Sequence, residues 1–406
     1  MLDNQKYNND NEVTTDYDYI ICGAGCAGIS LLLRILKEPK LQDKSILIID
    51  SDLKQNNDRT WCFWEDKIGF FDHLVFHKWS TLNLYTDKNN LKLNISPFSY
   101  KMIRSIDFYS YAKHIIAKHK NISWKQANLS DAGSLNDTAY IMADGLRITA
   151  KYVFNSIMLD DTKLKFKHDK CYKLLQHFKG WLIETKQPIF NHSEATFMDF
   201  RVSQDKGAAF VYVLPISSTR ALVEYTFFNK YVLNQSSYDE LLENYLEIHL
   251  RLNRSDYFKI ETEFGVIPMT NHQFNANTGN VINIGTNGGW TKPSSGFTFQ
   301  FIQKNSDVLV AKLKLDKRPV LEKNLKIAKY NFYDSTLLNI LYYNKLGASE
   351  IFFNLFLKNK SRVILQFLDN ETTLFEDIKI MNTVKLGIFL PSAIKQLVKS
   401  VLKNLI

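Results

Sequence analysis

The feature that most constrains the fold of this chain is a glycine-rich loop close to its N-terminus. Gly23, Gly25 and Gly28 follow the apolar stretch Tyr17–Cys22 and form a G-x-G-x-x-G pattern. Gly23 permits a tight turn, Gly25 removes a side chain that would block a pyrophosphate, and Gly28 lets a helix pack closely on a strand. Because the pattern alone is weak, its surroundings decide what it means.

The surroundings of the loop have the order that a dinucleotide-binding βαβ unit requires. An apolar helix is predicted over residues 29–36, a buried strand over residues 45–49, and Asp50 closes that strand. Amides at a helix N-terminus face the negative charge of a phosphate, and a carboxylate at the strand end accepts hydrogen bonds from ribose hydroxyls. Residues 16–50 are therefore predicted to bind a dinucleotide.

A second glycine motif favours FAD over a nicotinamide cofactor. A short apolar strand predicted over residues 281–285 runs into Gly285, Thr286, Gly288 and Gly289. Two-motif flavoproteins use such a turn to bring backbone against the ribityl phosphate and the flavin edge; an ordinary βα turn is the alternative. Together with a hairpin predicted over residues 141–156, this motif indicates an FAD protein.

Composition restricts the remaining classes of protein. The net charge of +9 suits an anionic membrane surface, and no run of basic residues or nucleic-acid module is present. The four scattered cysteines fit neither a disulfide framework nor a zinc site, which indicates a reducing compartment and no metal. We expect residues 1–15 to be a disordered tail rather than a signal peptide, and no stretch is apolar for the roughly 18 residues of a spanning helix.

The whole pattern predicts an α/β fold with an FAD-binding, Rossmann-like domain, an antiparallel substrate-binding sheet and a helical C-terminal region. Strand patterns recur at residues 91–95 and 207–228, and a helix is predicted over residues 297–313. From residue 330 the chain is rich in Leu, Ile, Phe and Lys, with almost no strand signal. The expected ranges are 16–60, 100–160 and 265–330 for the FAD domain, 61–99 and 161–264 for the substrate sheet, and 331–406 for the helical region.

Several motifs resemble the lycopene cyclase family, of the flavin-dependent lycopene β-cyclase type. The most specific are Asp-Arg-Thr-Trp-Cys-Phe-Trp at residues 58–64 and Gly-Thr-Asn-Gly-Gly-Trp-Thr-Lys-Pro-Ser-Ser-Gly-Phe at residues 285–297. Shorter stretches at residues 198–201, 210–226, 264–269 and 367–372 also match, so that the resemblance covers about residues 17 to 395.

The resemblance implies reduced FAD as cofactor, a linear carotene as substrate and β-ionone rings as product. The reaction is then an isomerisation without net redox change, and NAD(P)H is the expected reductant that keeps the flavin reduced. Some members have an arginine after the hairpin strand, where this chain has Asn155-Ser156-Ile157. Arg59 or Arg104 is the candidate for that flavin contact here.

Cyclising a ψ end group requires an acid that protonates C2, stabilisation of a carbocation that passes from C1 to C5, and loss of a proton from C6. The resemblance implies Glu224 as the acid, and its apolar strand neighbours predict a pKa raised by desolvation. The alternative is a strand glutamate that faces solvent. The candidates for a cation-facing wall, each worth about 0.5–2 kcal/mol if not simply core residues, are Trp61, Phe63, Trp64 and Trp290.

The C-terminal residues 392–406 have the pattern of an amphipathic helix. Lys395, Lys399 and Lys403 fall four apart, opposite the apolar residues Ile394, Leu397, Val398, Val401, Leu402, Leu405 and Ile406. An interfacial helix on the inner face of the membrane and a helix packed on the protein's own core explain the pattern equally well.

Two other functions stay open for such a chain. One is an FAD-dependent monooxygenase or prenyl-chain reductase that acts on a lipophilic substrate. The other is a non-catalytic, membrane-peripheral flavin-binding protein. The sequence does not predict the oligomeric state.

Overall fold

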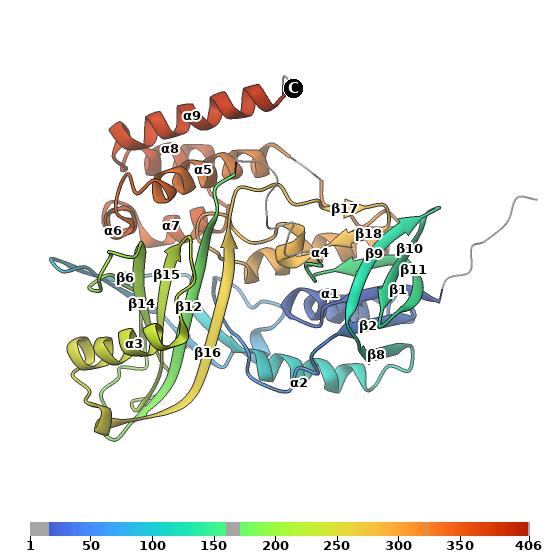
Figure 1. Ribbon diagram of the computed structural model, residues 1–406, viewed down its shortest axis with the longest axis horizontal. Coiled ribbons are helices and arrows are strands. Elements are labelled where there is room, and N and C mark those ends of the chain that lie inside the picture. The colour runs from blue at the N-terminus through green and yellow to red at the C-terminus, as the bar shows by residue number, and fades with distance from the viewer. Residues whose placement is uncertain (1–15, 160–170, 323, 405–406) are drawn as a thin grey trace, which may run out of the picture.

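The computed structural model describes residues 16–159, 171–322 and 324–404 of the protein (Figure 1). In this part of the chain the strands form three sheets, and a set of helices follows them toward the C-terminus. The predicted tail, residues 1–15, lies outside the described residues. Within those residues no helix combines the length and the apolar character that crossing a membrane requires.

An eight-stranded sheet contains the predicted βαβ unit. Its main order is β17-β18-β11-β1-β2-β8, in which β1 pairs in parallel with β11 and β2, β2 with β8, and β11 with β18. The predicted hairpin is confirmed, since β10 and β11 pair antiparallel around Asp144 and Gly145. The strands are β1 (Tyr17–Cys22), β2 (Ile46–Asp50), β8 (Ile122–Gln126), β9 (Leu129–Leu135), β10 (Thr138–Ala143), β11 (Leu146–Asn155), β17 (Asn277–Thr278) and β18 (Val281–Asn283).

One face of this sheet packs on three helices, α1 (Cys26–Lys37), α2 (Ser105–Ile116) and α4 (Phe299–Lys314). Alternate strand residues such as Ile21 and Ile48 enter this apolar cluster, while Ile20 and Leu47 point to the other face. Helix α1 begins three residues before the predicted start, because Gly25 is its N-cap.

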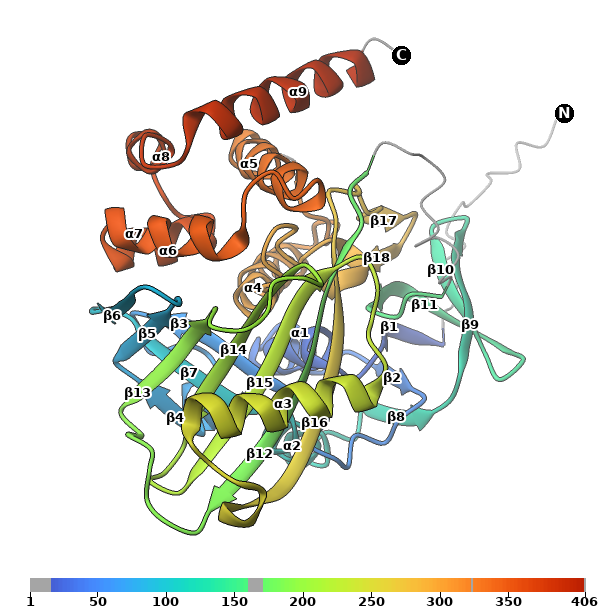
Figure 2. The same cartoon turned by 60° about the vertical axis from the view of Figure 1, so that its left-hand side comes forward.

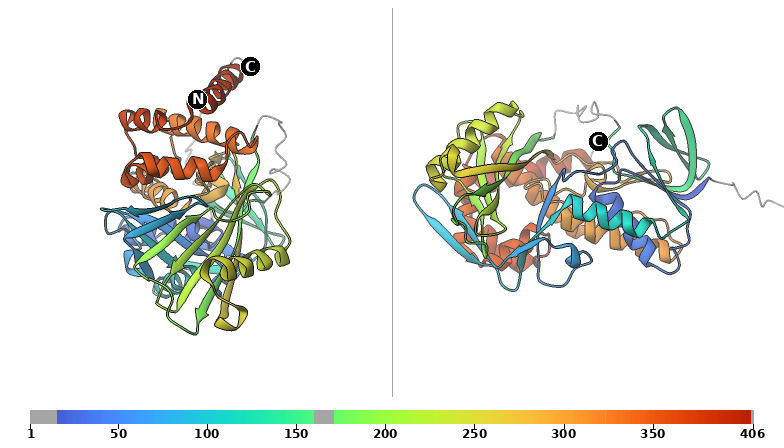
Figure 3. Two further views of the ribbon diagram at one scale, coloured as in Figure 1. Left: turned by 90° about the vertical axis from the view of Figure 1, so that its left-hand side faces the viewer. Right: turned by 90° about the horizontal axis from the view of Figure 1, so that it is seen from below.

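A seven-stranded sheet has the order β16-β12-β15-β14-β13-β5-β6 and is antiparallel except where β13 pairs with β5. Helix α3 (Gln235–Leu250) covers one face (Figure 2). Seen from below, the two large sheets lie at opposite ends of the molecule (Figure 3). The strands are β5 (Thr81–Tyr85), β6 (Asn90–Asn94), β12 (Leu174–Thr185), β13 (Glu194–Asp199), β14 (Ala208–Pro215), β15 (Arg220–Asn229) and β16 (Tyr257–Met269).

A small antiparallel sheet, in the order β3-β7-β4, contributes to both large apolar clusters. Its strands are β3 (Thr60–Glu65), β4 (His77–Trp79) and β7 (Ser99–Arg104). Because side chains alternate along a strand, one face of β3 contacts the helices of the dinucleotide-binding unit and the other faces the seven-stranded sheet. The short 3₁₀ helices are η1 (Asp72–Leu74), η2 (Arg254–Asp256) and η3 (Gly285–Gly288).

The predicted helical C-terminal region is confirmed, and it caps one side of the molecule (Figure 1). Residues of these helices join the inner face of the seven-stranded sheet in one large apolar cluster. The helices are α5 (Leu325–Tyr342), α6 (Ala348–Lys358), α7 (Ser361–Leu368), α8 (Leu374–Met381) and α9 (Leu386–Asn404). The residue ranges expected for the separate domains stay a prediction.

Helix α9 turns two polar residues inward and several apolar residues outward, although Ile388 and Phe389 near its start pack on the core. Ser392 and Gln396 are 0% and 6% exposed. Gln396 donates a hydrogen bond to the Tyr172 hydroxyl at 3.0 Å, and Lys345 donates one to Ser392 at 2.9 Å. The apolar residues that are about half exposed are Leu386, Leu390, Ile394, Leu397 and Val398.

This distribution contradicts packing on the core for three apolar residues of the C-terminal pattern, whereas contact of the helix with a membrane stays a prediction. Ile394, Leu397 and Val398 do not pack on the core, because each is more than half exposed. Lys399 lies on the inner side, where its ammonium group is 3.3 Å from the Tyr172 hydroxyl. The side chains of residues 400–406 lie outside the described ones.

Candidate active site

Each glycine of the first motif has its own structural reason. The backbone of Gly23 has φ +95°, which residues with a side chain rarely adopt. A Cβ on Gly28 would lie 2.0 Å from the Gly23 carbonyl oxygen, so α1 approaches the loop only because that atom is absent. A Cβ on Gly25 would have no atom within 4 Å. Open space therefore lies in front of Gly25, where a pyrophosphate is expected.

The start of α1 and the end of β2 fit the other parts of a dinucleotide. The N-cap Gly25 has no side chain that could bind the first amides of α1, and the first turn has no acidic residue. The amides at the start of α1 are therefore available to an anion. Asp50 is 7% exposed and accepts hydrogen bonds from the amides of Ala24 at 2.7 Å and Asp52 at 2.8 Å. Because each carboxylate oxygen accepts more than one hydrogen bond, Asp50 retains capacity for ribose hydroxyls.

The second glycine motif lies directly against the first. Gly285 has φ +58°, and a Cβ there would lie 2.9 Å from the Ala27 side chain in the first turn of α1. A Cβ on Gly288 would lie 2.3 Å from the Asn283 carbonyl oxygen, and Gly289 has φ +74°. The structure thus brings both predicted glycine motifs to one place, although some 260 residues separate them in the sequence.

The two candidate arginines lie at the boundary between the small sheet and its neighbours, with different partners. Arg59 donates to the Phe264 carbonyl oxygen at 3.0 Å, which ties the segment before β3 to strand β16. The Arg104 guanidinium is bound instead to Asp107, with N–O distances of 2.7 and 2.9 Å. Arg59 is exposed and Arg104 is half-buried.

Glu224 is half-buried, and it meets a second, buried acid, Glu263, across a strand that lies between them. Glu224 on β15 and Glu263 on β16 are both paired with Gly180 of β12, so their side chains share one face of the sheet. A Cβ on Gly180 would lie 3.1 Å from Glu263 Cγ. Since glycine leaves this space free, the two carboxyls are hydrogen-bonded to each other over β12.

Burial gives the two acids different proton affinities. Desolvation raises the pKa of Glu224 well above its usual range, and the neighbouring charge of Glu263 raises it further. Desolvation also raises the pKa of Glu263, but hydrogen bonds from Thr60 and Glu224 and the charge of Arg59 oppose that rise. Glu224 is therefore the protonated member of the pair, and it donates the hydrogen bond to Glu263.

Among the described residues, the titratable groups that interact with Glu224 other than Glu263 are neutral. Burial raises the pKa values of the Cys62 thiol and of the Tyr100 and Tyr212 hydroxyls, so all three stay protonated at neutral pH. Cys62 and Tyr100 are hydrogen-bonded to each other, and the Thr226 hydroxyl donates to Glu224 at 2.9 Å. The acid thus lies among neutral polar groups at the edge of a large aromatic cluster.

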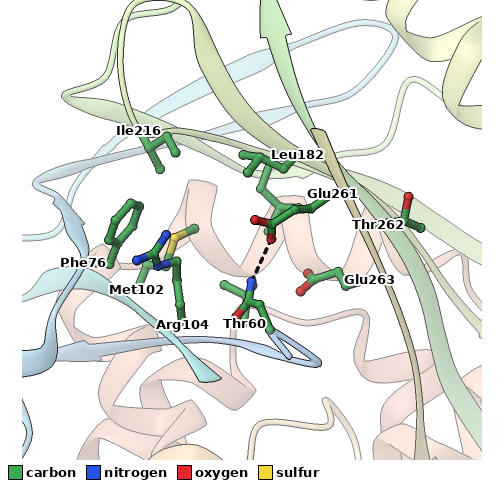
Figure 4. Close-up of a pocket in the computed structure, with 11 residues that line it drawn as sticks. Thr60, Phe76, Met102, Arg104, Leu182, Ile216, Glu261, Thr262 and Glu263 are labelled. Carbon is green, nitrogen blue, oxygen red and sulfur yellow. Dashed lines mark hydrogen bonds between the residues drawn. The ribbon is translucent and has the colours of Figure 1, made fainter. Parts of the chain in front are cut away.

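A hollow beside the acid pair opens between the small sheet and the seven-stranded sheet (Figure 4). Its walls come from β3 and β7 on one side and from β12, β15 and β16 on the other, and Glu263 points into it. Counted with its open mouth it has an empty volume of about 450 Å³. The residues around it are Asn57, Thr60, Phe76, Met102, Arg104, Leu182, Ile216, Leu222, Glu261, Thr262 and Glu263.

The structure does not bring the four aromatic candidates together as one wall. Trp61, Phe63 and Trp290 belong to the cluster around α1, α2 and α4, where the Phe63 ring stacks on Phe299 at 4.2 Å. Trp64 alone of the four contributes to the cluster on the inner face of the seven-stranded sheet. The reason is strand alternation along β3, which turns residues 61 and 63 away from residues 62 and 64.

The sequence prediction missed Glu263, Gly180, Cys62, Tyr100 and Tyr212. The signal for Glu263 was present, because it stands directly before the family-like stretch at residues 264–269. The signal for Gly180 was not, because its role depends on the register of three strands. Among the described residues, no group of three or more His, Cys, Asp or Glu side chains is placed to hold a metal ion.

Comparison with known proteins gives one family over nearly the whole chain. The family model described as "Lycopene cyclase protein" matches residues 18–392. A curated relative, the lycopene beta-cyclase of Pantoea ananas, is 26% identical over 217 residues. That match covers 52% of this chain and 52% of the relative, so it spans about half the length of the curated protein.

Several solved structures share the fold at low sequence identity. A flavoprotein/dehydrogenase from Cytophaga hutchinsonii has a TM-score of 0.60 and 11% identity, over 94% of this chain and 99% of that one. A geranylgeranyl bacteriochlorophyll reductase-like protein from Thermoplasma acidophilum has a TM-score of 0.56 and 12% identity, over 94% and 98%. The halogenase PltM, in complex with phloroglucinol and FAD, has a TM-score of 0.55 and 12% identity, over 87% and 82%. The fold is therefore that of flavoproteins.

Proposed function

Because this chain belongs to the lycopene cyclase family, we propose that it is an FAD-dependent carotene cyclase of the lycopene β-cyclase type. It converts the linear ψ end groups of lycopene to β-ionone rings, without net redox change. The observation that carries the proposal is the position of Glu224, a half-buried acid that contacts a second acid among neutral and aromatic groups and whose pKa desolvation raises. Protonating an unactivated alkene requires such an acid in such surroundings.

Glu224 starts the reaction by giving its proton to C2 of the end group. The positive charge then stands at C1, the C1–C6 bond forms, and the charge moves to C5. Loss of the proton from C6 leaves the ring double bond, so that protons and electrons balance. Trp64, Tyr100 and Tyr212 belong to the aromatic cluster beside the acid, and each ring would stabilise the cation by about 0.5–2 kcal/mol.

The cofactor site fits FAD, and several residues hold it. The loop of Gly23, Gly25 and Gly28 would receive the pyrophosphate, and Asp50 would bind the ribose hydroxyls. Gly285, Thr286, Gly288 and Gly289 would hold the ribityl and flavin part, and Arg59 would supply positive charge. When bound, reduced FAD supplies negative charge that stabilises the cation electrostatically, and NAD(P)H is the proposed source of its electrons.

Pigment analysis tests this function directly. We expect cells that make lycopene and express this chain to accumulate an isomer of unchanged mass and shifted retention. The Glu224→Gln variant should bind FAD but leave lycopene linear, whereas Glu184→Gln, at the exposed end of β12, should cyclise normally. Two added hydrogens would indicate the prenyl-chain reductase, and an added oxygen the monooxygenase. Unchanged lycopene with purified protein and reduced FAD would indicate the non-catalytic alternative.

We also propose that α8 and α9 dock the protein on an anionic bilayer at the inner face of the membrane, where a carotene is dissolved. Leu374, Phe375 and Ile378 of α8 are each more than half exposed, like the outer residues of α9. Exposed Lys379 and Lys395 stand among these apolar side chains. Each lysine near an anionic surface contributes about 1 kcal/mol, which makes such a surface complementary to this patch.

Vesicle co-sedimentation tests the docking surface. The double variant Phe375→Ser and Leu390→Ser should lose most of its binding to phosphatidylglycerol vesicles, because both side chains are exposed and neither supports the core. Ile248→Ser is the matched control, since Ile248 is 68% exposed on α3, away from the patch. Undiminished binding of the double variant would place the contact elsewhere, and a concentration-dependent dimer without vesicle binding would replace the bilayer by a second copy.

A further inference from the structure

The meeting of two acids over Gly180 is an arrangement that several residues maintain. Glu224 and Glu263 belong to strands that are not neighbours, and the missing side chain of Gly180 leaves space for them to meet. Thr60, at the start of β3, is hydrogen-bonded to Glu263. Arg59 contributes a positive charge to Glu263 and donates to the carbonyl oxygen of the next residue, Phe264.

A purely structural role does not explain this arrangement. A buried carboxylate that serves stability is normally paired with a cation, because like charges in a low-dielectric surrounding repel each other. Two glutamates in contact therefore destabilise the fold unless one of them is protonated. Such pairs are typical of sites that hold a proton for chemistry.

We propose that Glu263 is the positioning partner of the acid: it orients the Glu224 proton through their hydrogen bond, and the two carboxyls together hold the single proton that the reaction uses. This inference rests on the proposed cyclase function for its chemistry. Glu263 lies outside both glycine motifs and is therefore separate from the residues assigned to the cofactor.

The proton balance of the cycle follows from the pair. Before reaction, Glu224 is protonated and Glu263 is ionised. Transfer of the proton to C2 breaks the Glu224 O–H bond and leaves two carboxylates facing the carbocation, whose positive charge offsets their repulsion. When C6 loses its proton to the pair, the hydrogen bond forms again with the proton on Glu224. No electron is exchanged, and no other proton donor is needed.

The charged and titratable groups that face the pair define its pH dependence. Cys62 from β3, Tyr100 from β7 and Tyr212 from β14 face Glu224 and are neutral. The positive charge of Arg59 lowers the pKa of Glu263, and the negative charge of Glu261 raises it. Desolvation is the main cause of the raised pKa of Glu224, and the negative charge of Glu263 raises it further.

The decisive variant is Glu263→Gln in the FAD-loaded protein, assayed with lycopene in vesicles over a range of pH. Without the negative charge, the pKa of Glu224 falls, so the alkaline limb of the activity profile should shift down by about one pH unit or more. Turnover at the new optimum should fall about tenfold, because the proton is no longer oriented. FAD affinity should stay unchanged.

Glu184→Gln is the matched control, because it removes a carboxylate of the same sheet that pairs with Arg220 at an exposed end. Its pH profile should match that of the unchanged protein. A Glu263→Gln protein that folds and binds FAD but keeps the original alkaline limb would overturn the proposal.

Infrared titration separates this proposal from the proposed function, because it needs no turnover. The C=O band of a protonated carboxylic acid that disappears in Glu224→Gln belongs to Glu224. In Glu263→Gln that band should be lost at lower pH than in the unchanged protein. An identical titration contradicts the pairing, whereas a shifted titration in a protein that leaves lycopene linear supports the pairing and contradicts the cyclase.

Discussion

The two faces of the seven-stranded sheet bury acids in opposite ways. On the face under α3, Asp199 is 0% exposed and meets the Arg201 guanidinium at 2.6 Å and the Tyr245 hydroxyl at 2.8 Å. On the inner face, Glu224 meets another acid, Glu263. On the face under α3 the buried acid is therefore paired with a cation. On the inner face the acid contacts another acid, and it must keep its proton to avoid the repulsion of two negative charges. The first arrangement suits stability and the second suits proton transfer.

The strongest test of this contrast is a pair of isosteric changes. Glu224→Gln should lower cyclisation about 10²–10⁴-fold, the usual contribution of a general acid, while the unfolding free energy stays the same or rises. Asp199→Asn should do the reverse and lower the unfolding free energy by about 2 kcal/mol, since hydrogen bonds to charged groups weaken. Turnover and urea denaturation measure the two effects. Loss of turnover in a well-folded Asp199→Asn protein would contradict the assignment of Asp199 to stability and of Glu224 to proton transfer.

The two faces should also respond to pH with opposite signs. Burial lowers the pKa of His177, under α3, from 6.5 to about 4. Because the unfolded chain then binds the proton more readily, His177 removes up to about 3 kcal/mol of stability as pH falls from 6.5 to 4. Glu224 has a raised pKa, so it removes stability as pH rises above its ordinary value of 4.5.

Urea denaturation across pH measures both effects. His177→Gln should flatten the acid side of the stability profile, and Glu224→Gln should flatten the alkaline side. A Glu224→Gln variant that is least stable, relative to the unchanged protein, at high pH would have the wrong sign and would contradict a protonated Glu224.

The smallest expected effect comes from Gly180→Ala, which narrows the space between the two acids. The added Cβ would lie 3.1 Å from both Glu263 Cγ and Leu222 Cδ1, so these side chains must shift by a few tenths of an ångström. We expect cyclisation to fall about tenfold, while stability changes by less than about 1 kcal/mol, since alanine is better than glycine within a strand. Gly347→Ala, whose Cβ would meet no atom within 4 Å, is the control. Equal turnover of the two variants would show that the contact over Gly180 is dispensable.

The sequence predicted the parts of the molecule whose signals are local. The first glycine loop, Asp50 and the hairpin turn at Asp144 and Gly145 each depend on residues close in sequence, and the structure has the predicted elements there. The second motif could be linked to the first only through the requirements of a flavin. The family resemblance identified Glu224 as the acid. The sequence itself showed only that its neighbours are apolar residues of a strand.

The rest of the site depends on register and on strand faces, which a sequence does not specify. Nothing local shows that Glu224 and Glu263 are both opposite Gly180, because that requires the pairing of three strands. The aromatic candidates on β3 failed as a single wall for a related reason. Trp61 and Trp64 are three residues apart, so the pleat sends them to opposite faces.

The pairing of β11 with β18, which lies beside the two glycine motifs, has a consequence for folding during synthesis. Strand β11 pairs with β18, through Val153 and Val281, only after more than a hundred further residues have left the ribosome. Until then its edge offers unpaired amides and carbonyl groups to any other strand nearby. Synthesis of this protein should therefore depend on chaperones that shield the nascent chain over that interval, and slow translation of the middle section should increase aggregation.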